Sequence, residues 1–205
     1  STPKELLEGN VRVIACSLMC KILVNDVFDS FYESYPKLRL ELEENISLIS
    51  SFPDYLYKHN CNIGLNFFTN KEEETIYHYA EMHKMHINIL GKDTLGLFLC
   101  KDNPLACKNK IYIDDLKNLR FVGAFTSSEF TEDFVKYFNN DYSYRFSSLD
   151  TWIQIVERDR ASTILAKSNA RFIHNENIVV RHIEDVDIPY YYYLIYPEKH
   201  LLSVA

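Results

Sequence analysis

The sequence is poor in glycine, has no long apolar run and carries no excess of positive charge. Five of its 205 residues are glycine, about a third of the usual ~7%, which nearly excludes a glycine-rich loop that cradles phosphate. No apolar run approaches the roughly 18 residues that a membrane span needs. The 22 basic and 29 acidic side chains give a net charge of −7. Because phosphate binding needs the opposite sign, we do not expect this chain to bind DNA by itself.

The cysteines and the first residues of the chain indicate the cellular compartment in which the protein is expected. The cysteines form an odd set without paired spacing, which is typical of a reduced compartment and predicts a cytoplasmic protein without a membrane partner. They are Cys16, Cys20, Cys61, Cys100 and Cys107. The first residues contain no apolar signal core and no initiator Met. We therefore expect a piece of a longer protein.

The chain has ample material for a packed core, since 47% of its residues are apolar and 14% are aromatic. The first third alternates between strand-like and helix-like segments, which predicts an α/β fold with parallel strand order. Residues 38–43 alternate strictly between apolar and polar, as in a strand near a sheet edge. The expected segments are a strand at 11–15, a helix from Cys16 to Pro36, a strand at 38–43, a weaker helix at 46–60 offset at Pro53, and a strand at 61–67.

The remainder predicts a second α/β half. After a charged loop at 69–75, residues 85–90 look extended and 95–100 form an apolar strand. The later expected segments are a short helix at 113–116, strands at 120–124, 142–146, 162–166, 178–183 and 190–196, and helices at 130–138 and 151–158, the last one capped by 147–150. Two halves of similar make-up suggest two lobes with a cleft.

Polar residues at the strand-to-helix turns are the candidate ligand-binding residues. The free N–H groups at a helix start favour an anion, and hydroxyl groups there can donate as well. Asn66 ends a strand, where ligands of such sheets bind. The candidates are Cys16, Ser17, Asn45, Ser47, Asn66, Thr126, Ser127, Ser128 and Ser148. An alternative stays open, because Ser and Thr at such turns often only cap their own helices and Asn66 can simply start a loop.

Three other features have a functional and a structural interpretation. His78, His83 and His86 lie close together in the chain, but the stretch has no cysteine, and on an extended segment His83 and His86 would point to opposite faces. We expect neither a metal nor a cofactor. Cys16 and Cys20 lie four residues apart on the expected first helical turn, which could lower the pKa of a thiol and make this pair redox-active, although buried small residues are the commoner case. In Tyr190–Tyr193, strand alternation predicts two buried rings and two exposed rings, and exposed rings could mark a dimer contact.

Several motifs, taken in order, resemble the effector-binding domain of LysR-type transcriptional regulators. The similarity covers Lys4 to Ala205. The motifs are Val11-Arg12-Val13-Ile14-Ala15-Cys16-Ser17, the run from Phe31 to Leu42, Leu97-Phe98-Leu99-Cys100-Lys101-Asp102-Asn103-Pro104-Leu105-Ala106, Ser147-Ser148-Leu149-Asp150-Thr151, and the run from Tyr193 to Ser203. The chain departs from the family pattern where glycine is usual, at Ile14, Asn45, Asp159 and Ala161, and where proline is usual, at Ala166.

The resemblance implies two Rossmann-like lobes joined by two crossover strands, as in type 2 periplasmic binding proteins. Lobe I would comprise 11–91 plus 190–205, lobe II 92–189, and 1–10 would be a linker remnant. It also implies a small-molecule effector in the interlobe cleft, a homodimer or tetramer, and DNA binding only through a winged helix-turn-helix domain that precedes residue 1. The N–H groups at the helix starts predict that this effector is anionic. The resemblance further implies a closing helix after Ser203, which we expect to lie outside this piece of the protein.

Two other functions share parts of this pattern. A solute-binding protein of a transport system has the same two-lobe architecture, but it should carry an export signal and few free thiols. An enzyme would need a perturbed acid, base or metal centre, and no arrangement in the sequence supplies one. We therefore expect a ligand sensor that is not an enzyme.

Overall fold

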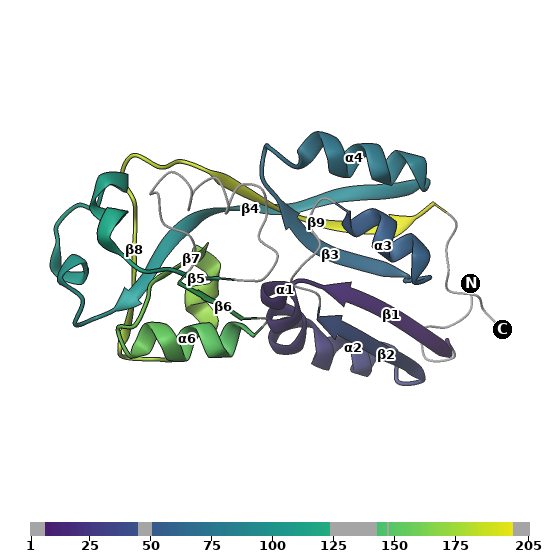
Figure 1. Cartoon of the computed structure of the whole chain (residues 1–205). Coiled ribbons are helices and arrows are strands. Elements are labelled where there is room, and N and C mark those ends of the chain that lie inside the picture. Colours follow the sequence, from purple (N-terminus) through teal and green to yellow (C-terminus); the bar gives the residue numbers. More distant parts are fainter. Residues whose placement is uncertain (1–6, 45–50, 124–142, 147, 199–205) are drawn as a thin grey trace. The chain divides into compact units, whose positions relative to one another are not determined.

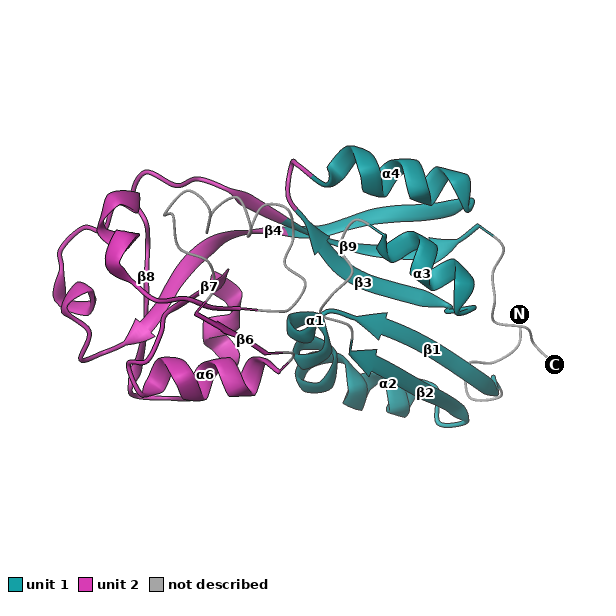
Figure 2. Cartoon of the chain, viewed as in Figure 1, with its two compact units in different colours: residues 1–68, 72–91, 191–205 teal, residues 69–71, 92–190 magenta. Residues whose placement is uncertain are grey.

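The computed structural model describes residues 7–44, 51–123, 143–146 and 148–198. The chain divides into two compact units, coloured separately in Figure 2. Unit 1 comprises Ser1–Phe68, Glu72–Gly91 and Tyr191–Ala205, and unit 2 comprises Thr69–Lys71 and Lys92–Tyr190. The predicted lobes differ from the units at 1–10, 69–71 and Tyr190. Gly9 and Asn10, predicted as part of a linker, already belong to a strand. The division into lobe I and lobe II stays a prediction.

Unit 1 is built on a mixed sheet in the order β2, β1, β3, β9, β4 (Figure 1). Its strands are β1 (Gly9–Ala15), β2 (Leu38–Glu44), β3 (Ile63–Phe68), β9 (Pro189–Pro197) and the first part of β4 (Met85–Cys100). β1 pairs in parallel with both β2 and β3, whereas β9 runs antiparallel to β3. The predicted parallel order of the first three strands is confirmed, and β2 lies at the sheet edge, as its alternation indicated.

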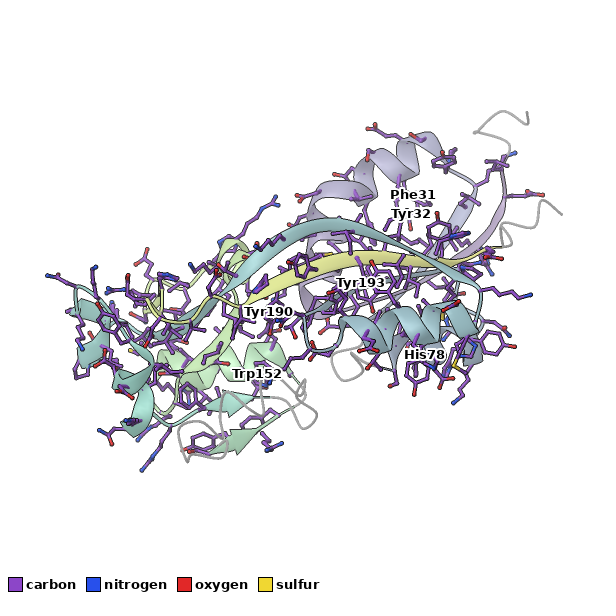
Figure 3. All side chains as sticks on the ribbon, turned by 90° about the horizontal axis from the view of Figure 1, so that it is seen from above. Phe31, Tyr32, His78, Trp152, Tyr190 and Tyr193 are labelled. Carbon is purple, nitrogen blue, oxygen red and sulfur yellow. The ribbon has the colours of Figure 1, made fainter. Side chains whose placement is uncertain are left out.

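The helices of unit 1 are α1 (Ser17–Ile22), a π-helical segment (Leu23–Val27), α2 (Phe28–Ser34), α3 (Phe52–Lys58) and α4 (Glu73–Met82). The helix predicted between Cys16 and Pro36 is therefore three consecutive helical segments. Figure 3 shows Phe31 and Tyr32 of α2 on one side of the sheet and His78 of α4 on the other. The region read as a charged loop at 69–75 already enters α4, because the buried Ile76 and Ala80 lie one turn apart and anchor this helix.

Gly64 of β3 lets α3 lie directly on the sheet. A Cβ atom at this position would lie 2.3 Å from Leu56 Cδ1, 2.8 Å from Phe52 Cε1 and 2.7 Å from Ile195 Cγ2. Leu56 and Phe52 belong to α3, whereas Ile195 belongs to β9. The absence of a side chain at Gly64 therefore sets how closely α3 packs on β3. Pro53 stands in the first turn of α3, a place that proline tolerates, so the expected offset there is the start of the helix.

The tyrosines of β9 depart from the predicted alternation. Tyr190, Tyr192 and Tyr193 are all buried, and Tyr191 is half-buried. The prediction of two exposed rings was wrong because both faces of β9 are covered. The Tyr193 ring lies 5.4 Å from that of Phe68, while the Tyr192 ring lies 6.4 Å from that of Phe67, a neighbour of opposite orientation on β3.

Unit 2 contains the second half of β4. The sequence predicts two separate extended segments here, at 85–90 and 95–100, but the structure joins them into one strand. β4 continues without a break from Met85 to Cys100 and pairs antiparallel with β7 (Thr163–Ala166) and β8 (Ile178–Arg181). Its remaining described elements are β5 (Val122–Gly123), β6 (Tyr144–Arg145), α6 (Leu149–Glu157) and 3₁₀ helices at Pro104–Cys107, Ile113–Asn118 and Lys167–Phe172. Of the predicted strand at 120–124, residues 120 and 121 precede β5 and residue 124 lies outside the described residues, as does the predicted helix at 130–138.

Candidate functional site

The turn between β1 and α1 places the first two candidate residues. Cys16 lies between the last residue of β1 and the first residue of α1, and its backbone N–H donates to the Leu65 carbonyl at 2.9 Å. This bond fixes the end of β1 beside β3. Cys16 is 4% exposed, whereas Ser17 begins α1 and is partly exposed. Of the two, Ser17 can therefore present its hydroxyl to a ligand.

The thiols of Cys16 and Cys20 are unsuited to act as thiolates. Burial raises the pKa of each to about 12, an effect that outweighs the backbone N–H groups of Met19 and Leu18 near Cys16. The Cys20 thiol also donates a hydrogen bond to the Ala15 carbonyl, with Sγ and O 3.5 Å apart. All five cysteines of the chain are described and none forms a disulfide. A redox pair at Cys16 and Cys20 is therefore disfavoured.

Asn66 belongs to a set of buried polar residues in unit 1. It is 2% exposed, and its Oδ1 accepts a hydrogen bond from the Phe67 N–H at 2.9 Å. Tyr193 stands directly opposite it on β9 and is fully buried. Glu72, which precedes α4, is 1% exposed, and both it and Cys16 raise the pKa of Tyr193, after burial as the largest cause. We call Cys16, Asn66, Glu72 and Tyr193 the inner polar cluster.

A second polar group joins β1, β2 and α3 nearer the surface of unit 1. Glu43 Oε2 accepts from Arg12 Nη2 at 3.0 Å, and Glu43 Oε1 accepts from the Tyr55 hydroxyl at 2.8 Å. Arg12 Nη1 also donates to the His59 carbonyl at 3.2 Å, and the His59 ring stacks on that of Tyr55 at 4.1 Å. We call Arg12, Glu43, Tyr55 and His59 the outer polar cluster. Its charged groups bind one another, so it serves to hold α3 against the sheet.

The candidates of unit 2 are only partly described. Ser148 precedes α6 and is exposed, and its side chain makes no capping hydrogen bond. Its carbonyl accepts from the Trp152 N–H at 3.2 Å. Of the residues 147–150 predicted to cap this helix, Ser148 precedes it without a side-chain capping bond, Leu149 and Asp150 already belong to it, and Ser147 lies outside the described residues. Five further candidates, Asn45, Ser47, Thr126, Ser127 and Ser128, lie outside the described residues.

The histidines of α4 and β4 have structural partners. His83 Nε2 lies 3.2 Å from Asp54 Oδ1, and the His83 ring stacks on Tyr57 at 4.3 Å. The His86 ring contacts that of Tyr196 at 5.5 Å. Across 7–44, 51–123, 143–146 and 148–198, no three His, Cys, Asp or Glu side chains are grouped to hold a metal ion. Among the helices of these ranges, none is both long and apolar enough to span a membrane.

Sequence reasoning missed Glu72 and Tyr193. Glu72 stands in a run of charged residues, which normally indicates a solvated loop. Its position just after a parallel strand, where ligands of α/β sheets bind, was the available signal. Tyr193 belongs to a run of four tyrosines, so the sequence does not distinguish it from its neighbours. Only the pairing of β9 with β3 shows which tyrosine lies opposite Asn66.

Comparisons with known proteins agree with this architecture. A family model described as the LysR substrate binding domain matches residues 4–205. The reduced form of the OxyR2 regulatory domain from Vibrio vulnificus is 17% identical, with a TM-score of 0.72 over 96% of this chain and 90% of that one. The effector binding domain of QuiR, in complex with shikimate, is 16% identical, with a TM-score of 0.71 over 96% and 90%.

A full-length OxyR variant from Pseudomonas aeruginosa has a TM-score of 0.73 at 14% identity, and the match covers 96% of this chain and 70% of that one. At these identities the structural likeness shows the fold, a mixed α/β fold of the type 2 periplasmic-binding-protein kind. None of the curated proteins compared with the chain matches it. Because the family model covers nearly every residue, the chain belongs to the LysR substrate binding domain family, the effector-binding domains of LysR-type transcriptional regulators.

Proposed function

We propose that this domain senses a small anionic effector and thereby modulates DNA binding by a winged helix-turn-helix domain of the same protein. The family match over residues 4–205 is the single observation that carries the proposal. The net charge of −7 disfavours DNA binding by this domain and so supports DNA binding by another domain of the protein. We propose a cytoplasmic homodimer or tetramer for the whole regulator, with no enzymatic activity in this domain.

An anionic effector is supported by the predicted contacts and by two neighbours. Ser17 is partly exposed at the start of α1, where N–H groups of the first helical turn favour negative charge. QuiR is described in complex with shikimate, a small ring carboxylate, and one OxyR2 regulatory domain is described as sulfate-bound. We propose that the effector is held by Ser17 of unit 1 and Ser127 of unit 2, within an interlobe cleft of the kind that the family resemblance implies.

Effector binding can change DNA binding only if the effector prefers one conformational state of the regulator. A coupling free energy of about 1–3 kcal/mol would change DNA affinity by about 5- to 150-fold. Oxidation of a cysteine in unit 1 is a poor alternative to effector binding as the sensed event, because the Cys16 and Cys20 thiols have pKa values raised to about 12. Noncovalent effector binding is therefore the mechanism that we favour.

Calorimetry and thermal shift with a panel of small carboxylates and amino acids, shikimate included, test this proposal. We expect at least one compound to bind, and the double variant Ser17→Ala/Ser127→Ala to lose at least tenfold in affinity. Ser30→Ala is the matched control, because the Ser30 hydroxyl of α2 bonds locally, to the carbonyl of Val27 in the preceding π-helical segment. Full affinity in the double variant would refute the site, and a panel without binders would refute the anionic effector. A helix-turn-helix encoded upstream of residue 1 would support the regulator assignment.

A further inference from the structure

The hydroxyl of Tyr193 is a fully buried polar group that no described residue hydrogen-bonds. Tyr193 lies on β9 in the interior of unit 1, as labelled in Figure 3, and none of its surface is exposed. Its ring contacts the ring of Phe68 at 5.4 Å and meets that of Phe52 edge-on at 6.4 Å. In the part of the chain that the structure describes, its hydroxyl has no hydrogen-bond partner. The ring is therefore well packed, while the hydroxyl is not.

Phenylalanine at this position would keep the ring contacts and remove the unsatisfied group. A buried hydroxyl without a partner destabilises a fold, whereas buried polar groups of native proteins are nearly always hydrogen-bonded to protein or to ordered water. A group outside the polypeptide that receives this hydrogen bond would account for the tyrosine.

Buried polar residues also lie near Tyr193. Asn66 stands opposite Tyr193 in the β3–β9 pairing and is 2% exposed. Glu72, 1% exposed, and Cys16, 4% exposed, both lie close enough to act on the ionisation of Tyr193. These residues come from the carboxyl ends of the parallel strands β1 and β3 and from the start of α4, the edge at which α/β sheets bind ligands.

We propose that the inner polar cluster binds one hydroxyl-type oxygen, which accepts a hydrogen bond from Tyr193. The oxygen belongs either to an internal water molecule or to a hydroxyl group of the effector. A hydroxyl-type oxygen fits because it can accept from the phenol and still donate to a carboxylate or amide oxygen of the cluster. With the effector as source, the inference deepens the proposed function and rests on it. The effector then carries a hydroxyl group in addition to its anionic group.

The test compares Tyr193→Phe with Tyr191→Phe, which changes a half-buried tyrosine of the same strand, whose ring also packs on Phe68 at 5.6 Å. The melting temperature Tm of each variant is measured alone and with equal concentrations of shikimate or of cyclohexenecarboxylate, the corresponding ring acid without hydroxyl groups. If the oxygen is water, Tyr193→Phe lowers the Tm of the free domain by about 2–4 °C more than the control does. If it belongs to the effector, the free domain keeps its Tm, and only the shift caused by shikimate is lost.

The inference is overturned if Tyr193→Phe leaves the Tm unchanged or raises it and the response to shikimate is not selectively lost. In that case the Tyr193 hydroxyl has no hydrogen-bond partner in either state, because removing an unsatisfied hydroxyl should not destabilise the domain. The result also separates this inference from the proposed function. A lower Tm in Tyr193→Phe, together with no response to any carboxylate in the wild type, would support the internal water and refute the anionic effector.

Discussion

Tyr55 and Tyr193 belong to the same unit and lie on the same side of its sheet, yet only one of their hydroxyl groups has a hydrogen-bond partner among the described residues. Tyr55 on α3 is only half-buried, and its hydroxyl donates to Glu43 at 2.8 Å. Tyr193 is fully buried, and its hydroxyl finds no partner among the described residues. A folding argument alone would predict the reverse, because a buried polar group needs its hydrogen bond more than a half-exposed one does. The outer polar cluster is satisfied by hydrogen bonds within the protein, whereas the described residues of the inner polar cluster leave the Tyr193 hydroxyl unsatisfied.

Gly64→Ala disturbs the packing of α3, which carries Tyr55 of the outer polar cluster and Phe52, whose ring meets that of Tyr193. The new Cβ would lie 2.3 Å from Leu56 Cδ1 and 2.8 Å from Phe52 Cε1, so these side chains or α3 itself must shift. We expect a loss of about 3 kcal/mol in the free energy of unfolding, the upper end for overpacking a core. Urea denaturation measures it. Gly91→Ala is the control, since nothing lies within 4 Å of a Cβ there. Equal stability of the two variants would show that α3 does not pack as described.

Tyr55→Phe sharpens the comparison, because it removes a hydrogen bond that the structure shows. We expect a loss of about 0.5–1 kcal/mol in the free energy of unfolding, since Tyr55 is only half-buried and water can partly replace it as a donor to Glu43. Urea denaturation of Tyr55→Phe, Glu43→Gln and the double variant isolates the coupling between the two residues. Tyr57→Phe changes an exposed tyrosine of the same helix and should be nearly neutral. Additive single effects would contradict a direct bond between Tyr55 and Glu43.

Some features of the candidate site follow from local sequence patterns, whereas others depend on contacts between distant segments. The turn at Cys16 and Ser17 follows from local patterns, a β-rich run and then helical spacing, and the structure places α1 there. The strand alternation of residues 38–43 likewise predicted the edge position of β2. Such features depend on neighbours in the chain, so a single sequence contains them.

The inner polar cluster depends on contacts between distant segments. Asn66 faces Tyr193 only because β9 returns to pair with β3, and no local pattern gives that register. Glu72 resembles a solvated residue because glutamates surround it, yet α4 begins immediately after it and the chain fold buries it. The family resemblance predicted the overall fold, but it could not show which polar residues are buried together.

The smallest expected effect is the response of the outer polar cluster to acid. The hydrogen bond from Tyr55, followed by that from Arg12, lowers the pKa of Glu43 below its usual value. A carboxyl group with a lowered pKa in the folded state stabilises the fold above its unfolded pKa of about 4.3, and this contribution is lost as the pH falls through the lowered pKa. Because the Glu43 side chain is 37% exposed, solvent screens much of the effect.

The Tm difference between the wild type and Glu43→Gln should therefore be constant from pH 7 to about pH 5 and shrink at lower pH. Tyr193→Phe provides the contrast, because burial raises the pKa of Tyr193, so that its phenol stays protonated throughout this range. Its Tm difference from the wild type should not depend on the ionisation of Tyr193 between pH 3 and 7. A Glu43→Gln difference that grows on acidification would mean that the Glu43 carboxylate destabilises the fold, and the outer polar cluster would not hold α3 in the way its geometry indicates.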